Sequence, residues 1–154
     1  MTPRSDAEAG FTLIEVVCVL AIIGLIVALV LPAIPRGTSQ ARLAGYAVEV
    51  AALLKSDRNA AMRSHAQVAT SLDAGRRIVV SGATASVVEI PADVTFEALL
   101  AQRCGDRRVG ATIEFFPSGE SCGGVIAIAR QGVGYQIRVN WLTGGVEVVP
   151  TGKS

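Results

Sequence analysis

One run of apolar residues near the amino terminus constrains this chain more than any other feature. No residue from Val16 to Pro35 is charged, and Glu15 stands directly before the run. Twenty residues of α-helix extend about 30 Å, which is the thickness of the hydrocarbon core of a bilayer. A run without polar residues also leaves no wet face for a core helix of a soluble domain. The sequence therefore predicts a transmembrane helix over residues 11–35.

A cleaved secretory signal is the main alternative for this segment. Such a signal needs a basic start, a shorter apolar centre and a small-x-small cleavage site. Here the first ten residues contain one basic residue, Arg4, and two acidic ones, Asp6 and Glu8, so the start is not basic. The stretch VALVLPAIP offers only a poor cleavage site. The sequence thus favours a retained helix. Arg36 follows the run, so the positive-inside rule leaves the orientation of the helix open.

The stretch from Gly10 to Pro32, GFTLIEVVCVLAIIGLIVALVLP, closely resembles the N-terminus of type IV pilins and of the pseudopilins of type II secretion. The resemblance implies that residues 1–10 form a leader and that prepilin peptidase cuts between Gly10 and Phe11. It further implies methylation of the new Phe11 amine and a role in assembly for Glu15. This leader is nearly neutral, whereas the leaders of pilins are usually basic.

The chemistry of these residues agrees with such a role. A glycine lets the backbone enter a protease cleft without a side chain in the way, and a freed amine on Phe11 is cationic at neutral pH. In a filament, Glu15 could pair with the amine of a neighbouring subunit in a low-dielectric environment, where losing one partner is costly. The alternative is a glutamate that extends to the lipid headgroups. Pro32 and Pro35 predict a kink where the helix leaves the membrane.

The next segment predicts an amphipathic helix over residues 36–66 that continues the membrane helix. Apolar residues recur there at helical spacing: Leu43, Ala47, Val50, Leu54 and Ala61. The predicted polar surface consists of Arg42, Glu49, Lys55, Asp57, Arg58 and Arg63. An apolar stripe of this kind packs against a sheet.

Short β-branched runs separated by Gly, Ser and Pro predict an antiparallel β domain over residues 67–154. QVATSL, RRIVVSG and ASVVEIP predict strands, and DVTFEALLAQRCGDRRVG predicts part strand and part loop. Two hairpins are predicted in ATIEFFPSGESCGGVIAIAR and GYQIRVNWLTGGVEVVP. The second alternates strictly, which places Tyr135, Ile137, Val139 and Trp141 on one face and predicts Trp141 in the core. The predicted fold class is α+β, a long N-terminal helix followed by two small antiparallel sheets.

These hairpins carry a second resemblance, to the carboxy-terminal part of minor pseudopilin H and related minor pilins. The matching residues are Phe116, Pro117, Gly119, Gly123, Gly124, Thr143 and Gly144. The resemblance implies a minor pseudopilin of type II secretion, held in the cell inner membrane with its β domain in the periplasm. Its implied partners are prepilin peptidase, other major and minor pseudopilins, and inner-membrane lipid. The alternative is a minor pilin of a type IV pilus, for motility, adhesion or DNA uptake.

One motif suggests an enzyme. GESCG, from Gly119 to Gly123, matches the G-x-S-x-G nucleophile elbow of serine hydrolases. That elbow needs a strand before it, a helix after it and a later histidine. Here a strand is predicted after it, and the single histidine, His65, lies upstream at a helix end or on the surface. We therefore expect a turn and no catalysis; the remaining alternative is a membrane-anchored enzyme with an unrecognised site.

Three cysteines are present. Cys104 and Cys122 would face the periplasm, an oxidising compartment in which a disulfide can form. The sequence leaves open whether their Cα atoms come within bonding reach. Cys18 is predicted to be a small apolar residue of the membrane helix.

Charge and ligand patterns exclude several partners. A net charge of +1 provides no electrostatic footprint for nucleic acid. The basic cluster Arg103, Asp106, Arg107 and Arg108 predicts a solvated loop, with a partner-binding patch as the alternative. No spacing of cysteines and histidine predicts zinc, and the tail VEVVPTGKS lacks a cluster of oxygen ligands for calcium. We expect neither a metal nor a cofactor.

Overall fold

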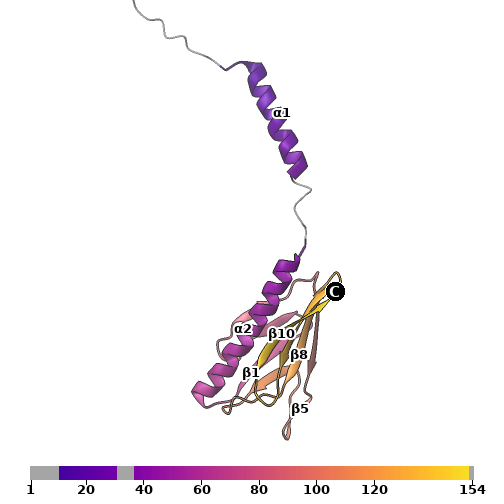
Figure 1. Cartoon of the computed structure of the whole chain (residues 1–154). Helices are drawn as coiled ribbons and strands as arrows, with labels where there is room; N and C mark the ends of the chain where they lie inside the picture. Colours follow the sequence, from indigo (N-terminus) through magenta and orange to yellow (C-terminus); the bar gives the residue numbers. More distant parts are fainter. Residues whose placement is uncertain (1–10, 31–36, 153–154) are drawn as a thin grey trace, which may run out of the picture. The chain divides into compact units, whose positions relative to one another are not determined.

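The computed structural model describes residues 11–30 and 37–152 (Figure 1). The chain divides into two compact units, Met1–Arg36 and Gly37–Ser154. The first unit contains helix α1 (Leu13–Val30), and the second contains helix α2 (Gln40–Ser64) followed by antiparallel strands. The predicted α+β class is confirmed.

Helix α1 has no polar face. Apart from Glu15 its residues are apolar or glycine, and all side chains from Phe11 to Ala28 are exposed. Glu15 lies in the first turn, where the partial positive charge of a helix N-terminus favours a carboxylate. Within the described ranges no helix is long and apolar enough to cross a membrane. The single-pass insertion therefore stays a prediction. The predicted leader and residues 31–35 of the predicted span lie outside the described residues.

Helix α2 begins later than the predicted range 36–66. Ser39 is extended (φ −71°, ψ 162°) and its side chain accepts a hydrogen bond from the backbone N–H of Arg42 at 3.3 Å, which makes it the N-cap. The prediction of one continuous helix is therefore wrong at residues 37–39. These residues are not helical, and Ser39 caps a new helix. The helix closes at His65, whose left-handed backbone (φ 51°) forms the C-cap.

Between α2 and residue 152 the structure describes ten strands. They are β1 (Val68–Asp73), β2 (Ile78–Val80), β3 (Val87–Glu89), β4 (Thr95–Leu100), β5 (Arg103–Cys104), β6 (Arg107–Arg108), β7 (Thr112–Phe115), β8 (Gly124–Arg130), β9 (Val133–Val139) and β10 (Val146–Gly152). The first sheet has the order β3-β2-β1-β7 and the second the order β10-β9-β8-β4. β5 and β6 pair only with each other. Two small antiparallel sheets were predicted, and both are present.

Helix α2 packs against both large sheets, on β1 of the first and on β8, β9 and β10 of the second (Figure 1). All five residues of the predicted apolar stripe are buried. They join the inward side chains of the sheets, of which the largest fully buried ones are Ile90, Ile113, Phe115, Ile126, Ile128 and Ile137. The apolar stripe of α2 thus packs against both large sheets, and the three form one hydrophobic core.

Asp57 is the exception to the predicted polar surface of α2. It is fully buried, and its carboxylate accepts four hydrogen bonds from the sheet side. The hydroxyl of Thr70 donates to Oδ2 at 2.6 Å, and the hydroxyl of Ser81 donates to Oδ1. The backbone N–H groups of Gly82 and Ala83 donate at 3.0 Å and 3.3 Å. The surface assignment of Asp57 was therefore wrong, because these donors replace the water that it would lose on burial.

The first predicted hairpin is also wrong, whereas the second is confirmed. β7 pairs with β1, and β8 pairs with β4 and β9, so the two strands belong to different sheets. After β7 the chain closes a turn in which the N–H of Gly119 donates to the carbonyl of Phe116 at 2.9 Å. The backbone N–H of Ser121 then donates to the carbonyl of Trp141 at 2.9 Å, which brings the chain next to the second sheet before β8 begins. β9 and β10 form the predicted closing hairpin.

Trp141 does not lie in the core as predicted. It is 67% exposed, whereas Ile137 and Val139 of the same alternating run are buried. The alternation ends because the Asn140 side chain accepts hydrogen bonds from the N–H groups of Leu142 and Thr143, which starts a turn. Trp141 therefore belongs to the turn between β9 and β10 rather than to the pleated strand.

The buried carboxylate makes a stability prediction. Asp57→Ala leaves two hydroxyls and the backbone N–H of Gly82 without an acceptor, while the N–H of Ala83 keeps the hydroxyl oxygen of Ser81 at 3.2 Å. We therefore expect the free energy of unfolding to fall by about 3 kcal/mol or more. Urea unfolding of the full chain in detergent, followed by circular dichroism, measures this loss. Lys55→Ala, at an exposed position of the same helix, should change it by about 0.5 kcal/mol or less. Equal losses for the two variants would contradict the role of Asp57.

Candidate functional site

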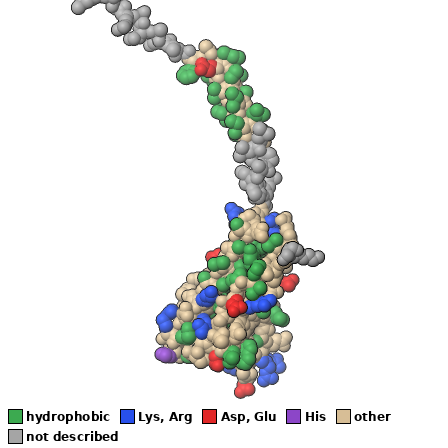
Figure 2. All heavy atoms as spheres, viewed as in Figure 1, with side chains coloured by type: hydrophobic (Ala, Val, Ile, Leu, Met, Phe, Trp, Pro, Cys, Tyr) green, Lys and Arg blue, Asp and Glu red, His purple; other side chains and the backbone are tan. Residues whose placement is uncertain are grey.

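The N-terminal motif lies on the first unit. Gly10 lies outside the described residues, while Phe11, two residues before α1 begins, is 84% exposed. Glu15 is exposed, and its backbone N–H donates to the carbonyl of Thr12 at 3.0 Å. Apolar side chains cover the visible face of α1 (Figure 2). A helix that exposes apolar residues on all sides needs lipid or other apolar helices around it.

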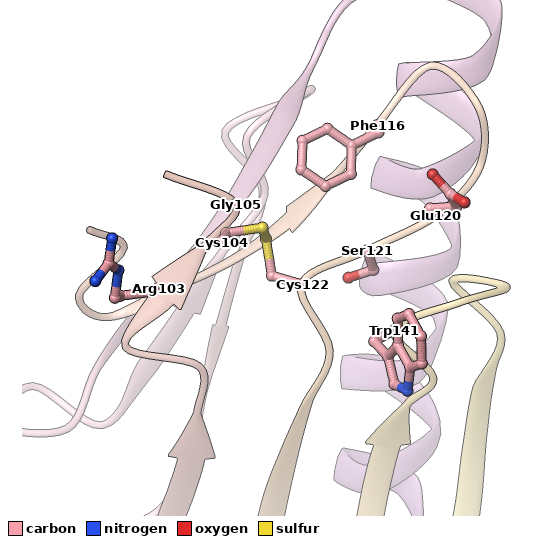
Figure 3. Close-up of a pocket in the computed structure, with 8 residues that line it drawn as sticks. All are labelled: Arg103, Cys104, Gly105, Phe116, Glu120, Ser121, Cys122 and Trp141. Atoms are coloured by element: carbon pink, nitrogen blue, oxygen red, sulfur yellow. A yellow bond between two sulfur atoms is a disulfide. The ribbon is translucent and has the colours of Figure 1, made fainter. Parts of the chain in front are cut away.

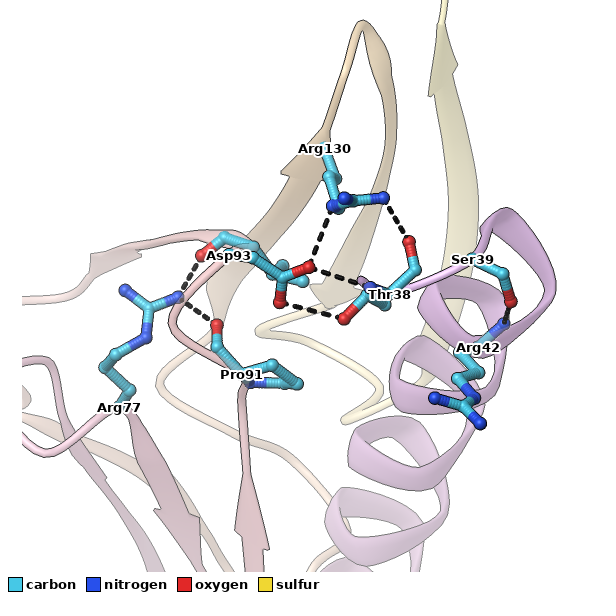
Figure 4. A network of polar contacts seen from close by, with 8 residues as sticks. Thr38, Ser39, Arg42, Arg77, Pro91, Asp93 and Arg130 are labelled. Carbon is cyan, nitrogen blue, oxygen red and sulfur yellow. Dashed lines mark hydrogen bonds and ion pairs between the residues drawn. The ribbon is translucent and has the colours of Figure 1, made fainter. Parts of the chain in front are cut away.

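The second unit begins at a polar clasp (Figure 4). The backbone N–H and the hydroxyl of Thr38 donate to the two carboxylate oxygens of Asp93 at 2.7 Å and 2.9 Å. Arg130 pairs with Asp93 at 2.9 Å through Nε, and its Nη1 donates to the carbonyl of Thr38. A side chain on Gly37 would overlap the Arg130 guanidinium. This clasp fixes the residue at which the N-terminal segment joins the β domain.

A second arginine supports the loop that carries Asp93. Arg77 donates through Nη2 to the carbonyl of Pro91 at 2.9 Å (Figure 4). Its Nε donates to the carbonyl of Ile90 at 3.2 Å. The hydrogen bonds from the backbone N–H and the hydroxyl of Thr38, together with the charge of Arg130, hold the pKa of Asp93 below its ordinary value. None of these residues was singled out from the sequence. Thr38 lies 55 positions and Arg130 lies 37 positions from Asp93, so no local sequence pattern indicates that they meet.

The residues of the second resemblance meet beside α2. Arg58, half-buried rather than part of the predicted polar surface, donates through Nε to the carbonyls of Gly119 at 3.0 Å and Thr143 at 3.1 Å. Gly119 (φ 89°) and Gly144 (φ 61°) both have left-handed backbones. A side chain on Gly144 would overlap the Gly119 carbonyl oxygen. The two glycines thus allow two loops, far apart in sequence, to touch under one arginine.

Cys104 and Cys122 are joined by a disulfide, with their Cα atoms 5.4 Å apart. The bond ties the β5–β6 hairpin to the link between β7 and β8. Beside it lies an open recess of about 540 Å³, lined by Phe116, Trp141, Arg103 and Glu120 as well as the cystine (Figure 3). Among the described residues, Cys104, Glu114 and Cys122 are the cluster with potential metal-ligating atoms. The disulfide removes both thiolates from this cluster.

The serine of the hydrolase motif has a structural role. Ser121 is buried and its hydroxyl donates to the carbonyl of Glu114 at 2.8 Å. A strand, β8, follows the motif, as the sequence predicts, where the elbow requires a helix. His65 is exposed at the end of α2.

Comparison with known proteins agrees with the motif and the fold. Residues 6–31 match the family described as the prokaryotic N-terminal methylation motif. The structure is similar to the minor pseudopilin EpsH of the type 2 secretion system of Vibrio cholerae, with a TM-score of 0.55 and 11% identity over 70% of this chain and 95% of that one. It is also similar to the type IV minor pilin FimU of Pseudomonas aeruginosa, with a TM-score of 0.54 and 16% identity over 73% and 92% of the two chains. No curated protein matches the sequence.

The clasp makes a pH-dependent prediction. Because the folded state lowers the pKa of Asp93, its contribution to stability is present above the ordinary pKa and is lost as the pH falls through the lowered one. We expect Asp93→Asn to lower the melting temperature near pH 7, and the difference from the wild type to shrink below about pH 4. Thermal unfolding between pH 3 and 7 measures it. Asp73→Asn is the control, because its ion pair with Arg76 is exposed and 3.9 Å long. A difference that persists unchanged to pH 3 would refute the assignment.

Proposed function

We propose that this chain, pilin-like in its N-terminal motif and in its fold, is a minor pseudopilin of a type II secretion system. It is held in the inner membrane by its N-terminal helix, with the β domain in the periplasm. After processing by prepilin peptidase it assembles with other pseudopilins into the pseudopilus that drives proteins across the outer membrane. The observation that carries this proposal is the exposed apolar α1 with one carboxylate in its first turn, set on a unit separate from the β domain.

Processing prepares the polar contact of assembly. Hydrolysis of the Gly10–Phe11 peptide bond leaves a carboxylate on the leader and an amine on Phe11, which is cationic at neutral pH. Methylation of that amine requires a methyl donor and keeps its basic character. The carboxylate of Glu15 on one subunit then accepts the ammonium of a neighbour in an apolar environment. An unpaired charge is costly there, so this pair sets the register in which helices associate.

We further propose that the chain is not an enzyme. The support is the use of Ser121 as a buried hydrogen-bond donor and the exposure of His65 at a helix end. The chain then acts by assembly. Neighbouring helices replace lipid around the apolar surface of α1, and each subunit that joins brings its β domain into the filament.

A minor pilin of a type IV pilus is the second candidate, and the likeness to FimU favours it. Of the type IV pilus roles, DNA uptake has the least support, because Lys153 is the single basic residue after Asn140. The two systems are told apart by deleting the gene in its own bacterium. Loss of protein secretion with intact surface pili supports the pseudopilin, and the reverse supports the pilin.

Processing predicts a defined mass. Co-expression with prepilin peptidase should yield a chain that begins at Phe11 and carries one added methyl group on its amino terminus. Mass spectrometry of the intact protein and its N-terminal peptide measures both features. A chain that still begins at Met1, or one cut near residue 34, would contradict the proposal.

Assembly predicts a separate defect. Glu15→Ala should leave processing at Gly10 intact but reduce incorporation into filaments, and hence secretion, by at least about tenfold, since one lost pair of this kind exceeds 1.4 kcal/mol. Sedimentation of sheared filaments and assay of secreted protein measure these effects. Glu49→Ala, at an exposed glutamate of α2, is the matched control. Secretion that survives Glu15→Ala unchanged would overturn the assembly role.

A further inference from the structure

The short hairpin β5–β6 places like charges against each other. Arg103 lies directly opposite Arg108, and Cys104 lies opposite Arg107. All three arginines are exposed. Like charges in directly opposed positions of an antiparallel pair are destabilising. We call the segment Arg103–Arg108 the basic hairpin.

The charge of the basic hairpin is only partly offset within the described part of the chain, because Asp106 at its turn is its single acidic residue beside three arginines. None of its arginines takes part in an ion pair there, and Arg107 reaches the neutral amide oxygen of Gln67 at 3.4 Å. The hairpin pairs with neither large sheet, yet the Cys104–Cys122 disulfide holds it at the Cys104–Arg107 pair, next to its turn. A hairpin that served only as a solvated loop would not need a disulfide to hold it. The disulfide therefore favours a role in which the three arginines keep a fixed position.

The recess beside the disulfide adds an apolar site to this charge. Figure 3 shows the cystine between Arg103 on one side and Trp141 on the other, with Phe116 above. Tryptophan and arginine are the side chains that most often anchor protein–protein contacts. Trp141 is exposed at the rim although it is large and apolar, so a partner that covered it would remove apolar surface from water.

We propose that the basic hairpin and this recess form one docking surface for an acidic segment of another protein. Carboxylates of the partner pair with Arg103, Arg107 and Arg108, and an adjacent apolar side chain enters the recess against Phe116 and Trp141. Bidentate pairing with a carboxylate suits the planar guanidinium. The surface lies on the β domain and does not depend on the N-terminal motif.

The negative charge of Glu120 in the recess favours an acidic peptide over a nucleic acid as the partner. Glu120 lines the recess together with Phe116 and Trp141, and its carboxylate accepts a hydrogen bond from the Ser118 hydroxyl at 3.0 Å. A phosphate backbone tracking across both features would meet this negative charge, whereas a peptide can keep its carboxylates at the hairpin and its apolar side chain in the recess.

Fluorescence polarisation with three labelled decapeptides tests the proposal on the full chain in neutral detergent. The probes are Gly-Ser-Glu-Glu-Glu-Gly-Leu-Phe-Gly-Ser, the same peptide with three lysines for the glutamates, and the same peptide with alanines for Leu-Phe. We expect saturable binding of the first peptide with a Kd below about 1 mM. Binding should be at least about tenfold weaker for each of the other two peptides.

Variants assign the binding to the surface. Arg108→Glu and Trp141→Ala should each weaken binding of the first peptide about fivefold or more, and reduction of the disulfide should do the same. Arg76→Glu, which makes the same charge change at an exposed arginine outside the surface, should leave it unchanged. Circular dichroism confirms that each variant is folded.

Several results would overturn the proposal. They are no saturable binding of the acidic peptide, equal binding of the lysine peptide, or equal weakening by Arg76→Glu. Tighter binding to a 20-nucleotide single-stranded DNA or to phosphatidylglycerol vesicles than to the acidic peptide would assign the surface to those ligands instead. None of these outcomes bears on processing at Gly10 or on Glu15, so failure here leaves the proposed function standing.

Discussion

One buried carboxylate ties the helix of the β domain to the first sheet. Asp57 lies in the apolar stripe of α2 and accepts hydrogen bonds from Thr70 in β1 and from Ser81, Gly82 and Ala83 after β2. A buried charge is tolerated only where donors of this kind surround it. The helix and the first sheet can therefore meet in one register, and the second sheet packs on the same helix through β8, β9 and β10.

The same helix organises both ends of the β domain. Just before its start, the clasp of Thr38, Asp93 and Arg130 fixes the point at which the chain enters. Nearer its end, Arg58 holds the loops of Gly119 and Thr143 in contact. Within residues 37–152 α2 is the single helix, so the entry point and the glycine loops are positioned by one rigid element.

The two units divide the tasks that the proposed function requires. The first offers an apolar helix with one carboxylate, which suits association with similar helices but stabilises no domain of its own. The second has a core of its own and a disulfide, so it can hold a surface of fixed geometry. The basic hairpin and its recess lie on this second unit, where their orientation is set by covalent and backbone constraints.

Local patterns in the sequence were enough to determine the N-terminal motif, the apolar stripe of α2, the strands β1 to β3 and the hairpin β9–β10. Each depends on residues a few positions apart. Asp57 could have been found as well, because it stands three residues after Leu54 and four before Ala61, within the stripe. Only the tertiary structure decided the separation of β7 from β8, the exposure of Trp141, the clasp at Asp93 and the joining of Cys104 to Cys122. These features depend on which distant segments pair, and that choice is made by the packing of both sheets on one helix rather than by any local preference.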